Sequence, residues 1–326
     1  MKENTLRIKT IILMLGLLGL IIVICCCEKG PTKPTLVTSE EVENIPFDRL
    51  QGKIYFRRFN PETPELYYFM ALDAEKKTLT GLAQFDMYVP TNLALSPNGE
   101  HLLFSYYILK GITLTFAWQL YVMEINSLAI RNVAPSEFND SYSAWSPGGD
   151  MISFWSNRDL KSAIWLTDFP EDSSRLLIEV AEIARTRCAW LPDGAQLVYS
   201  DTDSNQSAVL ILLELETWDK QTILREDESS ELIVYKHLSI APDGKQIAFV
   251  KAYAGGYDEL WIMNLESRET LRLTTGESDW HPVWSPDGSQ IIFSRGYALY
   301  LIKADGTELE RVTRGKGLDE FPTWGK

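Results

Sequence analysis

The sequence predicts an all-β protein: a six-bladed β-propeller with four antiparallel strands in each blade. One short motif recurs five times along the chain, and the two chain ends each hold part of a sixth copy. The chain has 326 residues, of which 45% are hydrophobic and 11% aromatic, which is enough to fill a large core. Strand-rich repeats of about 40 to 50 residues are typical of propellers.

The chain begins with a basic segment, MKENTLRIK, followed by an uncharged apolar run of 18 residues from Thr10 to Cys27. This pattern is typical of a signal peptide, and the run is slightly shorter than the roughly 20 residues of a membrane-spanning helix. The run ends in three cysteines, which resembles a bacterial lipoprotein signal. We predict a lipoprotein-type signal peptide over residues 1–27, lipidated at Cys27 or alternatively at Cys26. An uncleaved anchor remains the other interpretation.

Residues 28–47 are rich in Pro, Thr, Ser and Glu and show no apolar periodicity. We predict a flexible tether there and assign residues 48–326 to the propeller. The only cysteine outside the leader, Cys188, has no partner within that domain, so we expect a buried, small apolar residue rather than a disulfide.

The five copies of the repeat share a proline followed by a turn and a strand. Their prolines are spaced by 50, 45, 50 and 44 residues. The copies are ALSPNGEHLLFSYY from Ala94, AWSPGGDMISFWSN from Ala144, AWLPDGAQLVYSDT from Ala189, SIAPDGKQIAFVKA from Ser239 and VWSPDGSQIIFSRG from Val283.

Each copy is interpreted as two strands joined by a tight turn. Proline presets the first corner of the turn, and Asp or Asn followed by Gly supplies the rest. We therefore assign the Asp and Asn residues to turn formation and the repeated tryptophans to packing between blades. Alternating apolar residues after the turn mark a second strand. A third strand follows, such as QLYVMEINS from Gln119, and a short fourth strand leads into the next copy.

The chain ends supply the remaining blade. EFPTWGK, residues 320–326, matches the first half of a copy, and GKIYFRR, residues 52–58, matches the second half. We predict that the C-terminal strand pairs into the N-terminal blade and closes the ring, which removes an exposed sheet edge.

The pattern WSPDGxxIxFxS followed by LYxMxxDGxxxxLT resembles the TolB-like propellers, six-bladed relatives of the WD-type repeats. The resemblance extends from about residue 47 to residue 326. It implies a propeller in the cell envelope, on the periplasmic or extracytoplasmic side of a membrane, and leaves the function open because one fold serves many functions.

The formal net charge of −14 argues against nucleic-acid binding, because an acidic surface repels the phosphate backbone. The sequence contains no Gly-x-Ser-x-Gly, no His-Glu-x-x-His and no phosphate-binding loop, and it has only three histidines. We therefore predict a non-enzyme without a cofactor or a metal.

The repeat alignment places equivalent residues where the innermost strands begin, around one mouth of the central channel. We predict a candidate binding ring there, because loops and strand ends on a rigid scaffold often carry function. Its members are Asn92, Tyr142, Arg187, His237, His281 and Phe321, with Asp140, Asp279 and Asp319 two residues earlier in their repeats. The alternative interpretation is that these residues solvate the channel entrance and cap strand ends.

We favour a non-catalytic module, expected to be a monomer held at a membrane by its lipid, that binds an envelope protein or peptide through the channel mouth or the rim loops. One alternative is a binder of small ligands or glycans, with Phe138, Tyr142 and Trp280 as stacking surfaces. A third is a metal-dependent polysaccharide lyase or a related enzyme, in which His237 and His281 near Asp279 hold a divalent metal.

Overall fold

The computed structural model describes residues 9–13, 22–26, 39–86, 89–110, 115–181, 187–226 and 233–326. The chain divides into two units, residues 1–31 and residues 32–326. In the first unit, β1 (Lys9–Leu13) pairs antiparallel with β2 (Ile22–Cys26). Cys27 lies outside the described residues. Across the described ranges, no helix has both the length and the apolar character needed to cross a membrane.

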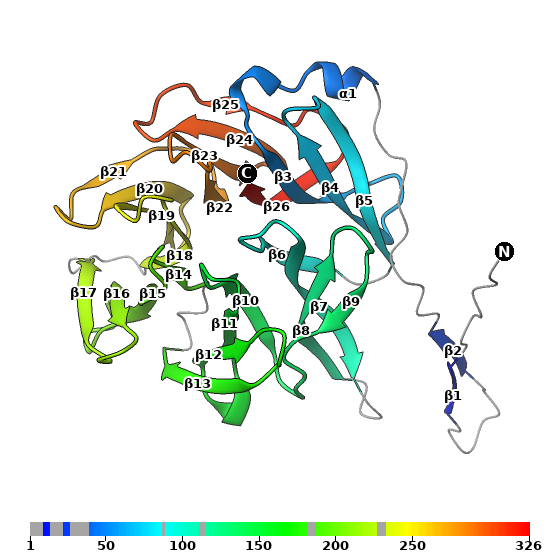
Figure 1. The fold of residues 1–326 in the computed structure, drawn as a ribbon, viewed down its shortest axis with the longest axis horizontal. Helices are drawn as coiled ribbons and strands as arrows, with labels where there is room; N and C mark the ends of the chain where they lie inside the picture. Colours follow the sequence, from blue (N-terminus) through cyan, green and yellow to red (C-terminus); the bar gives the residue numbers. More distant parts are fainter. Residues whose placement is uncertain are drawn as a thin grey trace. The chain divides into compact units, whose positions relative to one another are not determined.

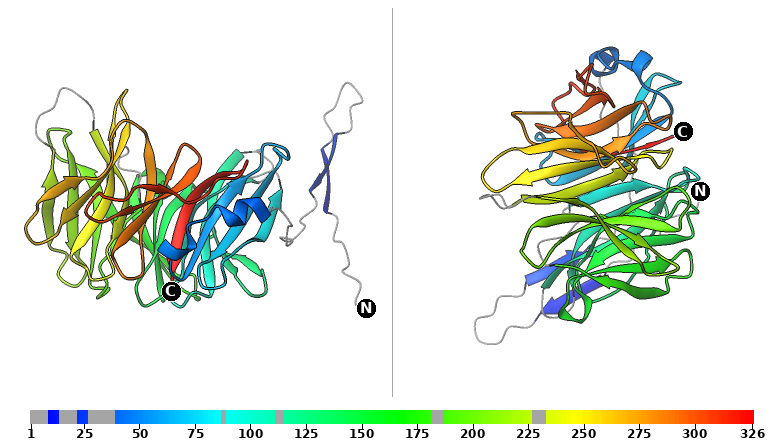
Figure 2. Two further views of the ribbon diagram at one scale, coloured as in Figure 1. Left: turned by 90° about the horizontal axis from the view of Figure 1, so that it is seen from above. Right: turned by 90° about the vertical axis from the view of Figure 1, so that its left-hand side faces the viewer.

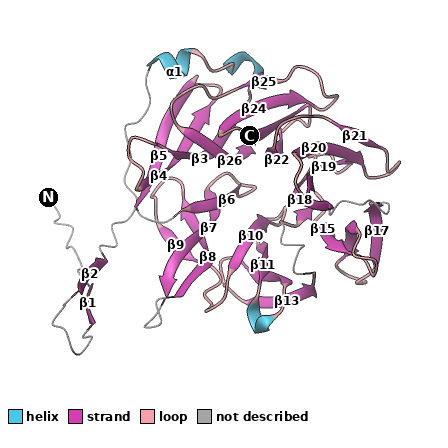
Figure 3. Cartoon of the chain, turned by 180° about the vertical axis from the view of Figure 1, so that it is seen from behind, coloured by secondary structure: helices cyan, strands magenta, loops and turns pink. Residues whose placement is uncertain are grey.

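The second unit contains six four-stranded antiparallel sheets arranged as blades around a central axis (Figure 1), as the sequence predicts. Secondary structure in this unit is almost entirely strand (Figure 3). From the axis outward, blade 1 consists of β26 (Leu318–Gly325), β3 (Lys53–Phe59), β4 (Leu66–Asp73) and β5 (Thr78–Asp86). Blade 2 consists of β6 (Pro90–Leu95), β7 (His101–Lys110), β8 (Thr115–Glu124) and β9 (Ile130–Asn132). Blade 3 consists of β10 (Asp140–Trp145), β11 (Met151–Ser156), β12 (Ala163–Asp168) and β13 (Ser174–Glu179).

The other three blades repeat this order. Blade 4 consists of β14 (Ala189–Trp190), β15 (Gln196–Thr202), β16 (Ala208–Glu214) and β17 (Lys220–Arg225). Blade 5 consists of β18 (Ile233–Ile240), β19 (Gln246–Tyr253), β20 (Asp258–Asn264) and β21 (Thr270–Arg272). Blade 6 consists of β22 (Asp279–Trp284), β23 (Gln290–Arg295), β24 (Ala298–Lys303) and β25 (Glu310–Arg311).

The C-terminal strand closes the ring. β26 pairs antiparallel with β3, and the pairing sets Trp324 opposite Ile54. Trp324 is buried in the core cluster between blades 1 and 6, and its indole nitrogen donates a hydrogen bond to the carbonyl of Gln51 at 2.6 Å. Both ends of the propeller sequence therefore lie in one sheet, which confirms the predicted closure.

The turns after the innermost strands of blades 2 to 6 have the predicted chemistry. Asn98, Asp193, Asp243 and Asp287 each accept a hydrogen bond from the backbone N–H two residues later, at 3.0 to 3.1 Å. The turn glycines have φ between 72° and 75°, a left-handed conformation that glycine adopts without steric cost; they are Gly99, Gly149, Gly194, Gly244 and Gly288. These side chains complete turns, so they are not available as catalytic carboxylates.

The core is divided among the blade interfaces, with one cluster of buried apolar side chains between each pair of neighbouring blades. The repeated tryptophans join these clusters and bond to the preceding blade. Their donor–acceptor pairs are Trp145 Nε1 to Ala94 O (3.2 Å), Trp190 Nε1 to Ser153 Oγ (2.9 Å) and Trp284 Nε1 to Ser239 O (3.0 Å). Cys188 is 1% exposed in the cluster between blades 3 and 4, and burial raises its pKa to about 12. The packing roles predicted for these residues are confirmed.

The segment before blade 1 differs from the predicted tether. It forms α1 (Ser39–Glu43) and a 3-10 turn over Phe47–Arg49. Ile45 is 6% exposed in the core cluster between blades 1 and 6, with Val42 and Phe47 packed against the same cluster. Residues 39–47 thus belong to the packed domain. The packing of this segment was not predicted from the sequence, because three apolar residues in a polar segment show no periodicity.

Edge-on views of the propeller unit show strands running between its two faces (Figure 2). In each antiparallel blade, the start of the innermost strand lies beside the end of the second strand; Asp279 of β22, for example, pairs with Arg295 of β23. Loops from the second to the third strand therefore lie on the same face as the starts of the innermost strands. We call this face the loop face.

Candidate functional site

The innermost strands share an irregularity near their middle. The strand register shifts at this point in five blades, and a non-glycine residue there has φ between 54° and 56°. These residues are Asn92, Tyr142, His237, His281 and Phe321. A left-handed backbone costs a non-glycine residue about 1–2 kcal/mol, so the surrounding structure must hold these five residues in place.

Of the nine residues of the predicted ring, six are equivalent residues of the innermost strands, and five of these six line one cavity on the propeller axis. We call Asn92, Arg187, His237, His281 and Phe321 the channel cluster. The sixth, Tyr142, shares the left-handed backbone but is not part of the cavity lining; its ring makes an edge contact with Trp155 at 6.5 Å between centroids.

The side chains of the channel cluster leave little space in this cavity. The His237 and His281 rings lie 4.2 Å apart between centroids, and those of His281 and Phe321 lie 3.9 Å apart. Arg187 donates a hydrogen bond from Nη2 to the carbonyl of Leu93 in blade 2, at 3.0 Å. The remaining cavity has a volume of about 10 Å³, the space for about one water molecule.

Arg57 of β3 is a functional candidate that the sequence analysis missed. Its guanidinium carbon lies 4.7 Å from the centre of the Phe321 ring, and Nη1 donates to the carbonyl of Pro90 at 3.2 Å. It also forms an ion pair with Glu320. Arg57 lies on the second strand of its blade, whereas the predicted ring contained only residues at equivalent positions of the innermost strands.

Burial controls the protonation of the channel cluster. It lowers the pKa of His237 to about 3 and that of Arg187 to about 10, and the charge of Arg187 further disfavours a protonated His237. Burial, followed by the charges of His237, Arg187 and Arg57, holds the pKa of His281 well below its ordinary value. At pH 7, Arg187 is therefore charged while both histidines are neutral.

These shifts predict a pH-dependent stability. The unfolded histidines bind protons below about pH 6.5, whereas the folded His237 stays neutral down to about pH 3. The unfolded state thus binds more protons between these limits, and the free energy of unfolding falls as the pH is lowered, by about 1.4 kcal/mol per pH unit for each histidine. We expect His281→Gln to reduce this slope in urea unfolding measured from pH 6.5 to 4.

The matched control for this experiment is His101→Gln. His101 lies outside the channel, with its ring against Phe169 at 5.5 Å between centroids. Carboxylates contribute equally to the slopes of the wild type and both variants, so the difference between slopes isolates the channel histidine. Equal slopes for the wild type and His281→Gln would contradict the protonation states assigned here.

The three aspartates of the predicted ring have a different role. Each is fully buried and held by an arginine through two hydrogen bonds, so none of them is free to bind a ligand. The pairs are Asp140–Arg158 (3.2 and 3.0 Å), Asp279–Arg295 (2.6 and 2.7 Å) and Asp319–Arg58 (2.7 and 2.8 Å). Each arginine also lies 5.2 to 5.7 Å from the ring of a phenylalanine on the second strand of its blade.

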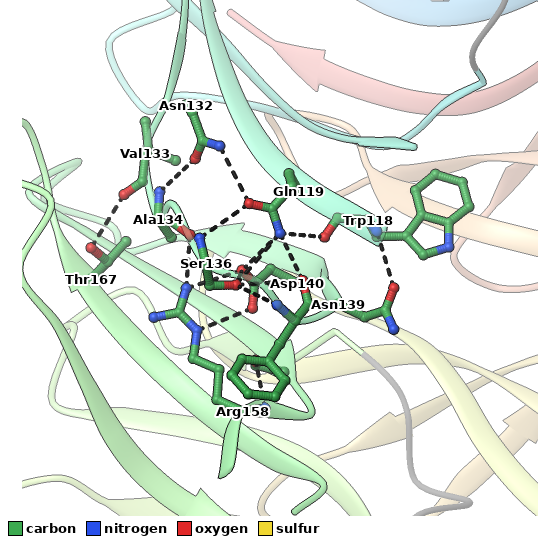
Figure 4. A network of polar contacts seen from close by, with 12 residues as sticks. Trp118, Gln119, Asn132, Val133, Ala134, Ser136, Asn139, Asp140, Arg158 and Thr167 are labelled. Atoms are coloured by element: carbon green, nitrogen blue, oxygen red, sulfur yellow. Dashed lines mark hydrogen bonds and ion pairs between the residues drawn. The ribbon is translucent and has the colours of Figure 1, made fainter. Parts of the chain in front are cut away.

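Asp140 belongs to a larger polar network between blades 2 and 3 (Figure 4). Its Oδ2 accepts hydrogen bonds from Ser136 Oγ at 2.6 Å and from Gln119 Nε2 at 3.4 Å, while Arg158 also donates to the carbonyl of Ala134 at 2.7 Å. Gln119 is fully buried on β8 and bonds to the carbonyl of Phe138 at 2.7 Å. The network fixes the loop between the two blades.

The two remaining residues considered for stacking are only partly exposed. The Trp280 indole nitrogen donates to Asp258 at 2.6 Å, and Phe138 lies in the loop fixed by Gln119. Asp279, considered as a third metal ligand beside the two histidines, is bound by Arg295. Within the described ranges, no three His, Cys, Asp or Glu side chains are grouped closely enough to hold a metal ion.

Comparison with known proteins gives partial matches in sequence. No family model matches the chain. It is 30% identical over 149 residues to the Tol-Pal system protein TolB of Anaeromyxobacter dehalogenans strain 2CP-C, a match that covers 44% of this chain and 29% of that protein. It is 27% identical over 152 residues to the uncharacterized peptidase YuxL of Bacillus subtilis strain 168, covering 46% of this chain and 21% of that protein. The chain thus matches less than a third of either relative.

Solved structures support the fold. TolB from Acinetobacter baumannii superposes with a TM-score of 0.69 and 17% identity, covering 83% of this chain and 66% of that chain. The putative TolB from Agrobacterium tumefaciens superposes with a TM-score of 0.62 and 17% identity, covering 84% and 94%. The propeller is therefore TolB-like in fold.

Proposed function

We propose that this protein is a non-catalytic interaction module of the bacterial cell envelope. In this proposal its TolB-like propeller lies on the periplasmic or extracytoplasmic side of a membrane, a lipid on Cys27 anchors it, and a protein or peptide partner docks on the loop face. The partial match to TolB proteins of Tol-Pal systems supports an envelope role. The partial match to a peptidase covers 21% of that protein.

The observation that carries this proposal is the small volume of the cavity between the channel-cluster residues. A cavity of about 10 Å³ admits neither a sugar ring nor a peptide side chain, which favours docking on the surface for a ligand of that size. The glycan-binding alternative places its ligand in the same part of the channel, where the channel cluster leaves little space. Neutral, weakly basic histidines with no carboxylate in the cavity lining are also poorly suited to acid–base catalysis.

The loop face offers apolar side chains for docking. Leu160, Tyr257 and Tyr297 lie in loops between second and third strands and are 90%, 57% and 51% exposed. Large apolar side chains that remain exposed on a rigid scaffold, and tyrosine in particular, are common in protein interfaces. Since the three come from blades 3, 5 and 6, the partner we propose spans part of the rim rather than a single loop.

The test is site-specific photocrosslinking in a bacterial strain that makes the full chain, followed by identification of the crosslinked protein. A triple variant with serine at positions 160, 257 and 297 is compared with a control variant, Trp218→Ser with Leu309→Ser. Trp218 and Leu309 are 53% and 46% exposed in loops between third and fourth strands, on the opposite face. We expect one dominant partner in the wild type and the control, with at least tenfold less in the triple variant.

Membrane fractionation of the same strain tests the anchor. With Cys27→Ser, we expect loss of radiolabelled palmitate and release of the protein from the membrane fraction, whereas Cys26→Ser retains both. Equal crosslinking in all rim variants contradicts docking on the loop face. If the palmitate label is lost with Cys26→Ser instead, the lipid is on Cys26 rather than Cys27. The docking proposal is unaffected by that result.

A further inference from the structure

We propose that the cavity on the propeller axis binds a small monovalent anion of about the size of chloride. The cavity is lined by Arg187, His237, His281 and Asn92 together with apolar residues and backbone. The residues of this site differ from Leu160, Tyr257 and Tyr297 of the proposed docking surface, and the inference does not depend on a protein partner.

The charge of the lining supports an anion. Arg187 is the only ionised side chain in the lining at pH 7, and no carboxylate contributes to it. Among the described residues, Arg187 donates one hydrogen bond, to the carbonyl of Leu93, and forms no ion pair. With respect to those residues, its other guanidinium N–H groups are available. Arg187 is partly buried. A bound anion would offset the cost of removing part of its charge from water.

The neighbouring cation strengthens this charge balance. Arg57 lies next to the channel cluster, stacked on Phe321, and its charge is already matched by Glu320. Glu320 is therefore already paired with Arg57, and none of the described carboxylates pairs with Arg187. The positive charge of Arg187 would be balanced by one monovalent anion.

A second, independent observation concerns another residue of the cavity lining. The Nδ1 atom of His281 is buried and has no hydrogen-bond partner. A neutral imidazole can carry its proton on Nδ1 and donate it to an anion, and an unsatisfied buried polar atom of this kind normally has an unseen partner. Arg187 and His281 thus both line the cavity, and both can act as N–H donors.

The size of the cavity sets the class of ligand. A volume of about 10 Å³ is the space for one water molecule, and among anions the monatomic ones are closest to that size. Phosphate, sulfate and the carboxylates of metabolites are much larger than this space. Chloride therefore matches the charge and the donors of the lining, and a single water molecule is the competing occupant.

Chloride binding can be measured on the full chain purified in detergent and dialysed into sodium gluconate at pH 7.5. Sodium chloride is then exchanged for gluconate at constant ionic strength. We expect the ³⁵Cl NMR line to broaden in a saturable way and bromide to reverse the broadening by competition. The melting temperature should rise by about 2–4 °C at a tenfold excess of chloride over its dissociation constant.

Arg187→Gln is expected to abolish both effects. Arg175→Gln is the matched control, because Arg175 is half exposed and pairs with Asp168 at the surface. The proposal is overturned if wild-type protein gives no saturable broadening, which leaves water as the occupant, or if Arg187→Gln broadens the line as the wild type does. If Arg187→Gln does not fold, the bromide competition on the wild type decides.

Discussion

A chain that ends at Gly317, and so lacks β26, is expected to lose its cooperative unfolding transition and most of its soluble yield. Three consequences act together. The edge of β3 becomes exposed, which invites aggregation. Trp324 leaves the core cluster between blades 1 and 6. Arg57 and Arg58 lose the carboxylates of Glu320 and Asp319 while remaining in a largely buried site.

The soluble fraction and the thermal unfolding profile of the truncated chain measure this effect. Trp324→Ala provides a graded comparison, because it keeps the strand and removes one buried side chain; we expect a loss of about 3–5 kcal/mol. Removal of Lys326 alone, an exposed residue, serves as the control and should change neither quantity. A truncated chain that melts cooperatively at the wild-type temperature would show that β26 is dispensable for the fold.

Replacing Arg58 with methionine is expected to lower the free energy of unfolding by about 3–5 kcal/mol. Although burial acts to lower the pKa of Arg58, the charges and hydrogen bonds of Asp319 and Glu41 raise it above its ordinary value. Both carboxylate side chains are nearly buried, at 0% and 8% exposed. Methionine fills much of the volume but leaves two buried carboxylates without a counter-charge.

Arg175→Met is the matched control for Arg58→Met. Its partner is also an aspartate, but both side chains of that pair are more than one third exposed, so we expect a cost below about 1 kcal/mol. Urea unfolding of the two variants and the wild type gives the comparison. If Arg58→Met costs no more than Arg175→Met, the buried ion pairs do not support ring closure in the way described here.

The sequence allowed the fold to be predicted because each blade repeats its own local signals. The proline–glycine turns and the tryptophan at the end of the innermost strands recur in register, so the half copy around Trp324 could be matched to the half copy after Gly52. Both halves carry the repeat, and no long-range information was needed to join them.

The contents of the channel could not be predicted in the same way. The alignment placed His237 and His281 on neighbouring blades, but whether their rings leave a pore or fill it depends on the strand bulges that turn them inward. Nor did the alignment identify the partners of the aspartates. Arg158 follows the second strand of blade 3, whereas Arg295 is the last residue of the second strand of blade 6. The two arginines therefore do not align as equivalents, although each binds the aspartate of its own blade.

Ring closure also has a consequence for the order in which the protein can fold. Arg58 and Asp319 are separated by 261 positions in sequence, yet they are bonded in one blade. Contacts of such high sequence separation are slow to form, because the entropy of closing the loop must be lost before the contact stabilises it. Because β26 follows every other described strand in the sequence, blade 1 can be completed only after β26 has been synthesised. Until then the other five blades have to persist as an open, incomplete assembly, and that is the stage at which we expect this protein to depend most on chaperones.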